Sequence, residues 1–123
     1  MILVDTSVWA RHIDRGIDAL SALLEAGDAS SHPFIVGEIA LGNLRRRDAV
    51  LTDLRLLPQT TAASHEEVMD MVERHKLFGR GIGYVDAHLL AATRLTHDSL
   101  LWTLDKKLAS AATQIGIAYQ PPT

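Results

Sequence analysis

The chain contains no cysteine. Disulfide bonds, thiolate catalysis and cysteine-based zinc sites are therefore excluded. It also lacks the ~18 consecutive apolar residues that a membrane-spanning helix needs. Its first residues, MILVDTSVW, lack the basic segment of a secretory signal. From these absences we expect a soluble protein of the cytoplasm that makes no contact with a membrane.

An excess of positive charge is also missing. The 12 Lys and Arg residues are outnumbered by 15 Asp and Glu, and the formal net charge is −3. A broad basic surface of the kind that wraps duplex DNA is therefore not expected. The short cluster Arg45–Arg47 has two interpretations, closure of a helix at its negative end or contact with a phosphate backbone. Any contact with nucleic acid should accordingly be local.

What the chain does contain is enough apolar material for one core. Its 123 residues are 47% hydrophobic, which suits one domain and is too little for two. We therefore expect a single domain over residues 1–123.

The apolar pattern predicts strands that alternate with helices. Two continuous apolar runs, Ile2–Val4 and Leu100–Leu104, are too short for helices and predict buried strands. Helices are predicted from Thr6 or Ser7 to about His12, over 17–26, from Pro33 to the arginines, and over 49–57, 65–78, 84–96 and 106–112, with weaker strands at 59–62 and 117–119. Buried strands between helices indicate an α/β fold with a mostly parallel sheet that is covered on both faces.

Two acids directly follow the predicted buried strands. Asp5 comes after the first strand and Asp105 after the second. In an open parallel sheet, functional groups gather outside the carboxyl ends of the strands. Either acid could instead cap the helix that follows it, since Asp suits that position well.

Two further acids lie on predicted helices. Asp86 falls in the first turn of a helix that follows the glycine-rich stretch GRGIG, and Glu38 sits in a helix among apolar residues. Favourable placement near a helix dipole is the alternative for Asp86, and a solvated helix face is the alternative for Glu38.

If these four acids converge, their charges require a cation. Two like charges ~4 Å apart repel by about 4 kcal/mol at an effective dielectric constant near 20. A site made of oxygen ligands alone selects hard ions such as magnesium or manganese. Such ions polarise phosphoryl oxygens and activate water, which is the chemistry of phosphodiester hydrolysis.

Four stretches in order along the chain carry a resemblance to a known family. ILVDTSVW, GEIALG, GYVDAHLLAA and LLWTLDKKL together resemble the PIN-domain nucleases, specifically the short VapC-type toxins of bacterial toxin–antitoxin pairs. The resemblance implies a three-layer α/β/α fold and metal-dependent cleavage of RNA. It implies an acidic quartet of Asp5, Glu38, Asp86 and Asp105, with hydroxyl support from Thr6 and Thr103. It also implies a small antitoxin that covers the site, and a homodimer.

The sequence hypothesis is therefore a magnesium- or manganese-dependent endoribonuclease. Asp5, Asp86 and Asp105 would hold the metal, Glu38 would complete its shell or orient the attacking water, and Thr103 would position a ligand or phosphate. Thr6, Lys106 and Lys107 are the predicted substrate-binding residues, although the two lysines could equally belong to a solvated helix start.

Three alternatives remain at this point. The first is a PIN-like binding module without turnover. The second is a phosphatase with an aspartate nucleophile, but that chemistry needs a second acid two residues after Asp5, where Ser7 stands. The third is a phospho-receiver, which clusters extra acids beside its first strand, whereas this chain offers only Asp5 there.

Overall fold

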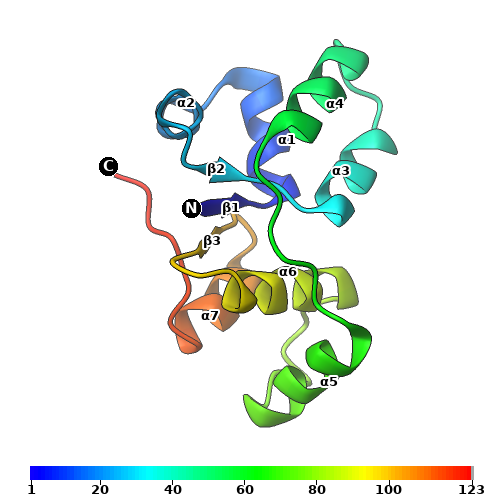
Figure 1. Cartoon of the computed structure of the whole chain (residues 1–123), viewed down its shortest axis with the longest axis vertical. Coiled ribbons are helices and arrows are strands. Elements are labelled where there is room, and N and C mark those ends of the chain that lie inside the picture. The colour runs from blue at the N-terminus through cyan, green and yellow to red at the C-terminus, as the bar shows by residue number, and fades with distance from the viewer. Residues whose placement is uncertain (123) are drawn as a thin grey trace.

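The computed structural model describes residues 1–122 and places a three-stranded parallel sheet between two layers of helices (Figure 1). The elements follow the order β1 (Ile2–Val4), α1 (Thr6–Arg15), α2 (Asp18–Ala26), β2 (Ala29–Ser30), α3 (Pro33–Ala40), α4 (Arg47–Leu56), α5 (His65–Arg74), α6 (Tyr84–Leu95), β3 (Leu100–Trp102) and α7 (Lys106–Gln114). Helices α1 to α4 lie on one side of the sheet and α5 to α7 on the other. The predicted three-layer α/β/α fold is confirmed.

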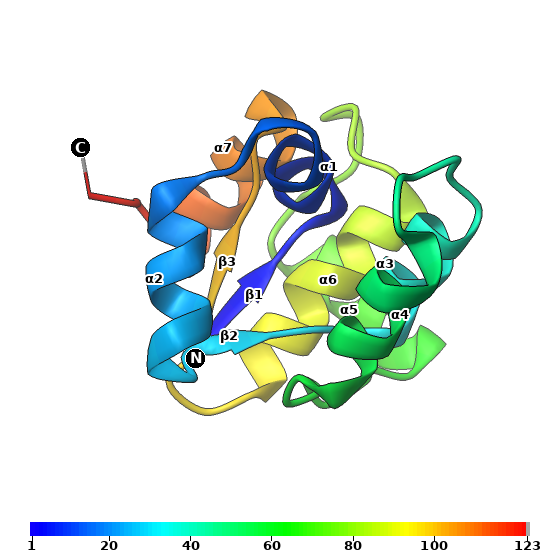
Figure 2. The ribbon, with the colours of Figure 1, turned by 90° about the horizontal axis from the view of Figure 1, so that it is seen from above.

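The register of the sheet fixes where its strands end. The strand order is β2-β1-β3, and β1 pairs with β3 so that Val4 lies opposite Trp102. The backbone N–H of Asp5 donates to the carbonyl of Trp102 at 2.9 Å and continues the ladder by one residue. The residues that follow β1 and β3 therefore begin side by side at one edge of the sheet (Figure 2).

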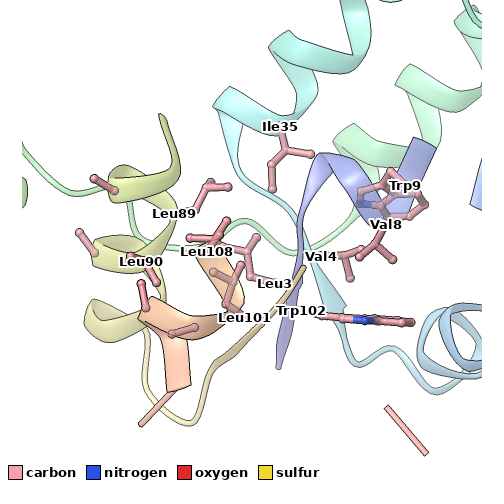
Figure 3. Packing of buried hydrophobic residues seen from close by; sticks show 14 of the residues in the cluster. Leu3, Val4, Val8, Trp9, Ile35, Leu89, Leu90, Leu101, Trp102 and Leu108 are labelled. Carbon is pink, nitrogen blue, oxygen red and sulfur yellow. The ribbon is translucent and has the colours of Figure 1, made fainter. Parts of the chain in front are cut away.

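Alternate residues of the strands pack against the two helix layers. Figure 3 shows Leu3 and Leu101 on the side of α6 and α7, where Leu89, Leu90 and Leu108 pack. Val4 and Trp102 face the other layer, together with Val8, Trp9 and Ile35. Burying one such side chain contributes about 1.5–3 kcal/mol, so a strand end that is packed on both faces is held firmly. Trp9 and Trp102 are only 6% and 3% exposed, so both tryptophans belong to the core.

Several predicted boundaries are wrong. Helix α3 ends at Ala40 and does not reach the arginines, because the Arg47 guanidinium folds back to the Ala40 carbonyl, with Nε and Nη2 at 3.0 and 2.8 Å. Strand β3 ends at Trp102, two residues earlier than predicted. The chain leaves the strand at Thr103, whose hydroxyl bonds to Asp5 and to the backbone N–H of Asp105. In the described part of the chain, none of the helices has the length and apolar character that a bilayer crossing demands.

The weaker strand predictions are corrected in a similar way. The segment predicted at 59–62 forms a single bridge, Ser31 to Gln59, and the segment at 117–119 forms a single bridge, Leu101 to Ala118. The short strand Ala29–Ser30 was not predicted, because two small residues carry no hydrophobic pattern.

Candidate active site

Asp5 is the most buried acid at the edge of the sheet. Its side chain is 6% exposed. One carboxylate oxygen, Oδ2, accepts hydrogen bonds from Ser7 Oγ and Thr103 Oγ1, each at 2.7 Å. Asp5 occupies the N-cap position of α1, but its side chain bonds to no backbone N–H of that helix. The helix-capping interpretation of Asp5 is therefore wrong, and two hydroxyl groups hold the carboxylate instead.

Ser7 and Thr103 tie the two strand ends together around that carboxylate. Ser7 Oγ accepts from the backbone N–H of Leu104 at 3.0 Å, and Thr103 Oγ1 accepts from the N–H of Asp105 at 3.1 Å. The two hydroxyl oxygens lie 3.3 Å apart. Ser7 was not predicted as a site residue. The available signal was that Ser7 lies two residues after Asp5. A side chain in the first turn of a helix can reach back to the residue that precedes the helix.

Asp105 combines a helix cap with a free oxygen. Its Oδ1 accepts from the backbone N–H groups of Lys107 and Leu108 at 2.9 and 3.0 Å. The capping interpretation is thus right for this acid. Because both bonds use Oδ1, Oδ2 is left for another partner.

Asp86 lies in the first turn of α6, where its Oδ2 accepts from the backbone N–H of Gly83 at 3.1 Å. Burial raises the pKa of Asp86 most, and the negative charges of Asp5 and Asp105 raise it further, while the Gly83 bond opposes them. The fold therefore brings three carboxylates from distant parts of the sequence into one electrostatic neighbourhood.

Glu38 reaches the same region from α3. Its Oε1 accepts from Thr6 Oγ1 at 2.8 Å, and Thr6 is the residue after Asp5. Glu38 and Asp105 are both exposed, whereas Asp86 is partly buried and Asp5 is buried, so Glu38 is open to solvent and to a ligand. The interpretation of Glu38 as part of a solvated helix face accounts for its exposure but not for its hydrogen bond to Thr6.

These acids offer the oxygen ligands that magnesium and manganese prefer. As the side chains stand in residues 1–122, no three acids or histidines are close enough together to hold one ion. The donor chemistry nevertheless fits a divalent cation, since Asp105 has an unused oxygen and since the mutual repulsion felt by Asp86 is the kind that a cation relieves.

The lysines after Asp105 differ from each other. Lys106 is exposed. Lys107 lies across Gly81 so closely that a Cβ built on that glycine would be 2.9 Å from Lys107 Cδ and 3.0 Å from Nζ. A second contact binds the same loop to α7, because Arg80 Nη2 donates to Ser110 Oγ at 3.0 Å. The glycine-rich loop before Asp86 is thus packed onto the helix that follows Asp105.

Comparison with known proteins agrees with this architecture. The family model of the PIN domain matches residues 2–114. Ribonuclease VapC32 from two strains of Mycobacterium tuberculosis is 44% identical over 118 residues, which is 96% of this chain and 95% of that protein. The crystal structure of FitAcB from Neisseria gonorrhoeae has a similar fold, with a TM-score of 0.59 and 19% identity over 92% of this chain and 94% of that one.

Proposed function

This chain belongs to the PIN-domain family and to its VapC type, and on that premise we propose that it is an endoribonuclease that acts as the toxin of a toxin–antitoxin pair. The observation that carries the proposal is the position of Asp5. Two hydroxyls hold its buried carboxylate where two strands end, and its charge acts on Asp86 together with that of Asp105. The whole-length similarity to a ribonuclease supports the same reading.

We propose that Asp5, Asp86 and Asp105 hold a magnesium or manganese ion, and that Glu38 completes its shell or orients the attacking water. When bound, such an ion supplies a Lewis acid for a phosphoryl oxygen and lowers the pKa of water.

The residues of the chain itself have separate roles in this proposal. Thr103 fixes the direction of the Asp5 carboxylate, because its hydroxyl donates to Oδ2 at 2.7 Å. Thr6 holds Glu38 at the edge of the site and contacts substrate there. Lys106 and Lys107 offset the phosphate charge, since both lie in the first turn of α7 directly after Asp105. The reaction is attack of water on a phosphodiester, in line with the leaving oxygen.

The partners of the proposed toxin follow from the VapC type. We propose a small antitoxin that covers the acidic site and blocks it, a homodimer of the chain itself, and action in the cytoplasm on RNA. A chain without cysteine suits that compartment.

Cleavage of RNA by the purified chain tests the proposal. A panel of single-stranded and structured RNAs is incubated with magnesium, with manganese and with EDTA. Asp5→Asn should lower the cleavage rate at least roughly a hundredfold, which corresponds to about 2.7 kcal/mol of transition-state stabilisation. Asp14→Asn is the matched control, because Asp14 is an exposed acid on α1, the helix that Asp5 precedes, and its ion pair within residues 1–122 is with its neighbour Arg15.

Two outcomes would contradict the proposal. Cleavage that persists unchanged in Asp5→Asn would remove the acidic site from the chemistry. Calorimetry that shows RNA binding by the wild-type chain, without cleavage of any RNA in magnesium or manganese, would favour the inactive binding module.

A further inference from the structure

Five rings form a continuous row that crosses from α3 to α6 and on to α5. His32 meets Phe34 with ring centroids 5.0 Å apart, and Phe34 meets His88 at 4.9 Å. His88 meets Tyr84 at 4.6 Å, and Tyr84 meets His65 at 5.7 Å. The first three contacts are edge-to-face, with interplanar angles of 68°, 67° and 84°. We call these five residues the aromatic row.

The buried members of the aromatic row fix the exposed ones. His32 and His88 are 1% and 6% exposed, whereas Phe34 and Tyr84 are 39% and 50% exposed. His32 Nδ1 accepts from the backbone N–H of Phe34 at 3.0 Å, and His65 Nδ1 lies 2.7 Å from the Tyr84 hydroxyl. Two flat apolar rings are therefore held open to solvent in fixed orientations, which lowers the entropy cost of binding a ligand on them.

The aromatic row joins α3 and α6, the two helices that carry Glu38 and Asp86. Phe34 precedes Glu38 by four residues on α3, so the two side chains are neighbours along one face of the helix. Tyr84 directly follows Gly83, whose N–H holds Asp86. The contact between Phe34 and His88 joins α3 to α6, which lie next to each other in Figure 2. A nucleotide whose phosphate meets the acids would thus have its base, or that of a neighbour, within reach of these rings.

The chemistry of the aromatic row suits a base better than a phosphate. Burial, and then the neighbouring His88, lower the pKa of His32, so that ring is neutral at neutral pH. A neutral ring gives phosphate no ionic attraction. Aromatic side chains instead stack on unpaired bases, and each stacked base contributes about 1–3 kcal/mol of binding. Stacking is valuable here, because a chain with a net charge of −3 gains little from general attraction to RNA.

We propose that Phe34 and Tyr84 form a stacking platform for an unpaired RNA base beside the cleavage site. The platform rests on the proposed ribonuclease function. It selects single-stranded segments, loops or bulges, because the bases of a duplex are already stacked on one another and cannot reach the rings.

The test compares RNA binding by ring variants with EDTA present, so that no cleavage interferes. The probe is a short fluorescein-labelled single-stranded RNA of mixed sequence, free or annealed to its complement. Phe34→Ala and Tyr84→Ala should each weaken binding of the single strand about 5- to 150-fold, and should leave the weak binding of the duplex unchanged. Tyr84→Phe and Phe34→Trp keep a flat ring and should retain most of the affinity.

Two further variants separate stacking from simple loss of packing. Phe34→Leu keeps apolar bulk without a flat face, and should bind as weakly as Phe34→Ala while its melting temperature stays near that of the wild type. Phe78→Ala is the matched control, because Phe78 is the other phenylalanine of the chain, is 61% exposed and stands outside the aromatic row. With magnesium present, Phe34→Leu should raise KM and leave kcat unchanged.

Three results would overturn the platform. One is a wild-type chain that cleaves RNA while Phe34→Leu and Tyr84→Ala bind the single strand as tightly as Phe78→Ala. Another is equal weakening for duplex and single strand. The third is a change in oligomeric state, measured by light scattering, with unchanged RNA affinity, because the rings would then cover a second copy of the chain. Ring-dependent binding by a wild-type chain that cleaves nothing would support the platform and reject the proposed function.

Discussion

The acidic site has two halves that are built differently. The strand-end half consists of Asp5, Thr103 and Asp105, and its two carboxylates each accept two hydrogen bonds, from hydroxyls in one case and from backbone N–H groups in the other. The helix half consists of Glu38 and Asp86, and each of these acids accepts one bond, from Thr6 and from Gly83 respectively.

The difference shows which acids have a fixed direction and which can adjust. Pairing of β1 with β3 brings Asp5 and Thr103 together before any ligand arrives, and packing on both faces of the sheet keeps them there. Glu38 and Asp86 each accept one hydrogen bond, so their positions depend on that single contact and on helix placement. We infer that the strand-end half sets the geometry of the site and that the helix half closes around what binds.

Removal of one hydroxyl from the strand-end half should have the largest effect. Thr103→Val keeps the shape of the side chain but loses the donor to Asp5 and the acceptor for the N–H of Asp105. We expect the rate of RNA cleavage to fall about 10- to 100-fold, which is the usual cost of losing a group that orients a metal ligand. Thr103→Ser should restore most of the rate.

Thr113→Val is the control for this substitution. Thr113 is an exposed threonine on α7 whose hydroxyl donates to the Ala109 carbonyl of the same helix. A loss of melting temperature in Thr103→Val at unchanged activity would mean that the strand-end hydroxyls serve stability and not the direction of Asp5.

Lys107 follows Asp105 closely in the chain, and Gly81 lies in the loop before Asp86, so the contact between them joins the two halves of the site. Its removal should have an intermediate effect. Gly81 has a φ of 78°, so Gly81→Ala strains the backbone by about 1 kcal/mol and also displaces Lys107. We expect a several-fold rise in KM for RNA, because Lys107 would leave the phosphate, together with a fall of a few degrees in melting temperature.

Gly79→Ala separates the two consequences. Gly79 has a similar φ of 72°, but a Cβ there would meet nothing within 4 Å. It should lower the melting temperature by a similar amount and leave KM unchanged. A KM that is raised equally in both variants would show that RNA binding depends on the conformation of the loop and not on the position of Lys107.

The two halves also differ in how far the sequence predicts them. Asp5 and Asp105 could be predicted because each follows a continuous apolar run, and a strand end is visible in a local pattern. The link from Glu38 to Thr6 could not be derived locally, since it depends on how α3 packs beside α1. The metal-binding roles of all four acids stay predictions.

The aromatic row illustrates the same limit. Its five residues are spread over 57 positions, from His32 to His88, with His32 at the N-cap of α3 and the other four on α3, α5 and α6. The sequence alone gives no sign that these five rings meet. Contacts of this kind arise from tertiary packing, which has no signature in hydrophobic periodicity or in turn residues.

Removal of a hydroxyl from the helix half should have a smaller effect than its counterpart at the strand ends. Thr6→Val loses the donor to Glu38, an exposed acid that water can also solvate. We expect cleavage to fall less than about fivefold, since a hydrogen bond that water can replace contributes roughly 1 kcal/mol or less. The measurement is the ratio of initial rates for Thr6→Val and Thr103→Val under the same conditions. A loss in Thr6→Val that equals the loss in Thr103→Val would break the comparison, because Glu38 would then need as fixed a direction as Asp5.

The smallest expected effect concerns the stability of the metal-free protein. Because the pKa of Asp86 is raised, the folded chain binds that proton more tightly than the unfolded chain, whose carboxyl has its ordinary pKa of 3.8. Ionisation of Asp86 therefore weakens the fold progressively as the pH rises from 3.8 through the raised value. Asp86→Asn removes this cost, so in EDTA at pH 7 it should melt a few degrees above the wild type, and the difference should shrink toward pH 3.8.

Magnesium should reverse the order of the two melting temperatures, because only the wild type keeps the third carboxylate to bind it. Asp14→Asn, at an exposed acid, should change neither measurement. An Asp86→Asn variant that melts below the wild type in EDTA at pH 7 would mean that the Gly83 bond outweighs burial and the charges of Asp5 and Asp105. The helix half would then be held by its own contacts as firmly as the strand-end half, and the division between a fixed and an adjustable side of the site would fail.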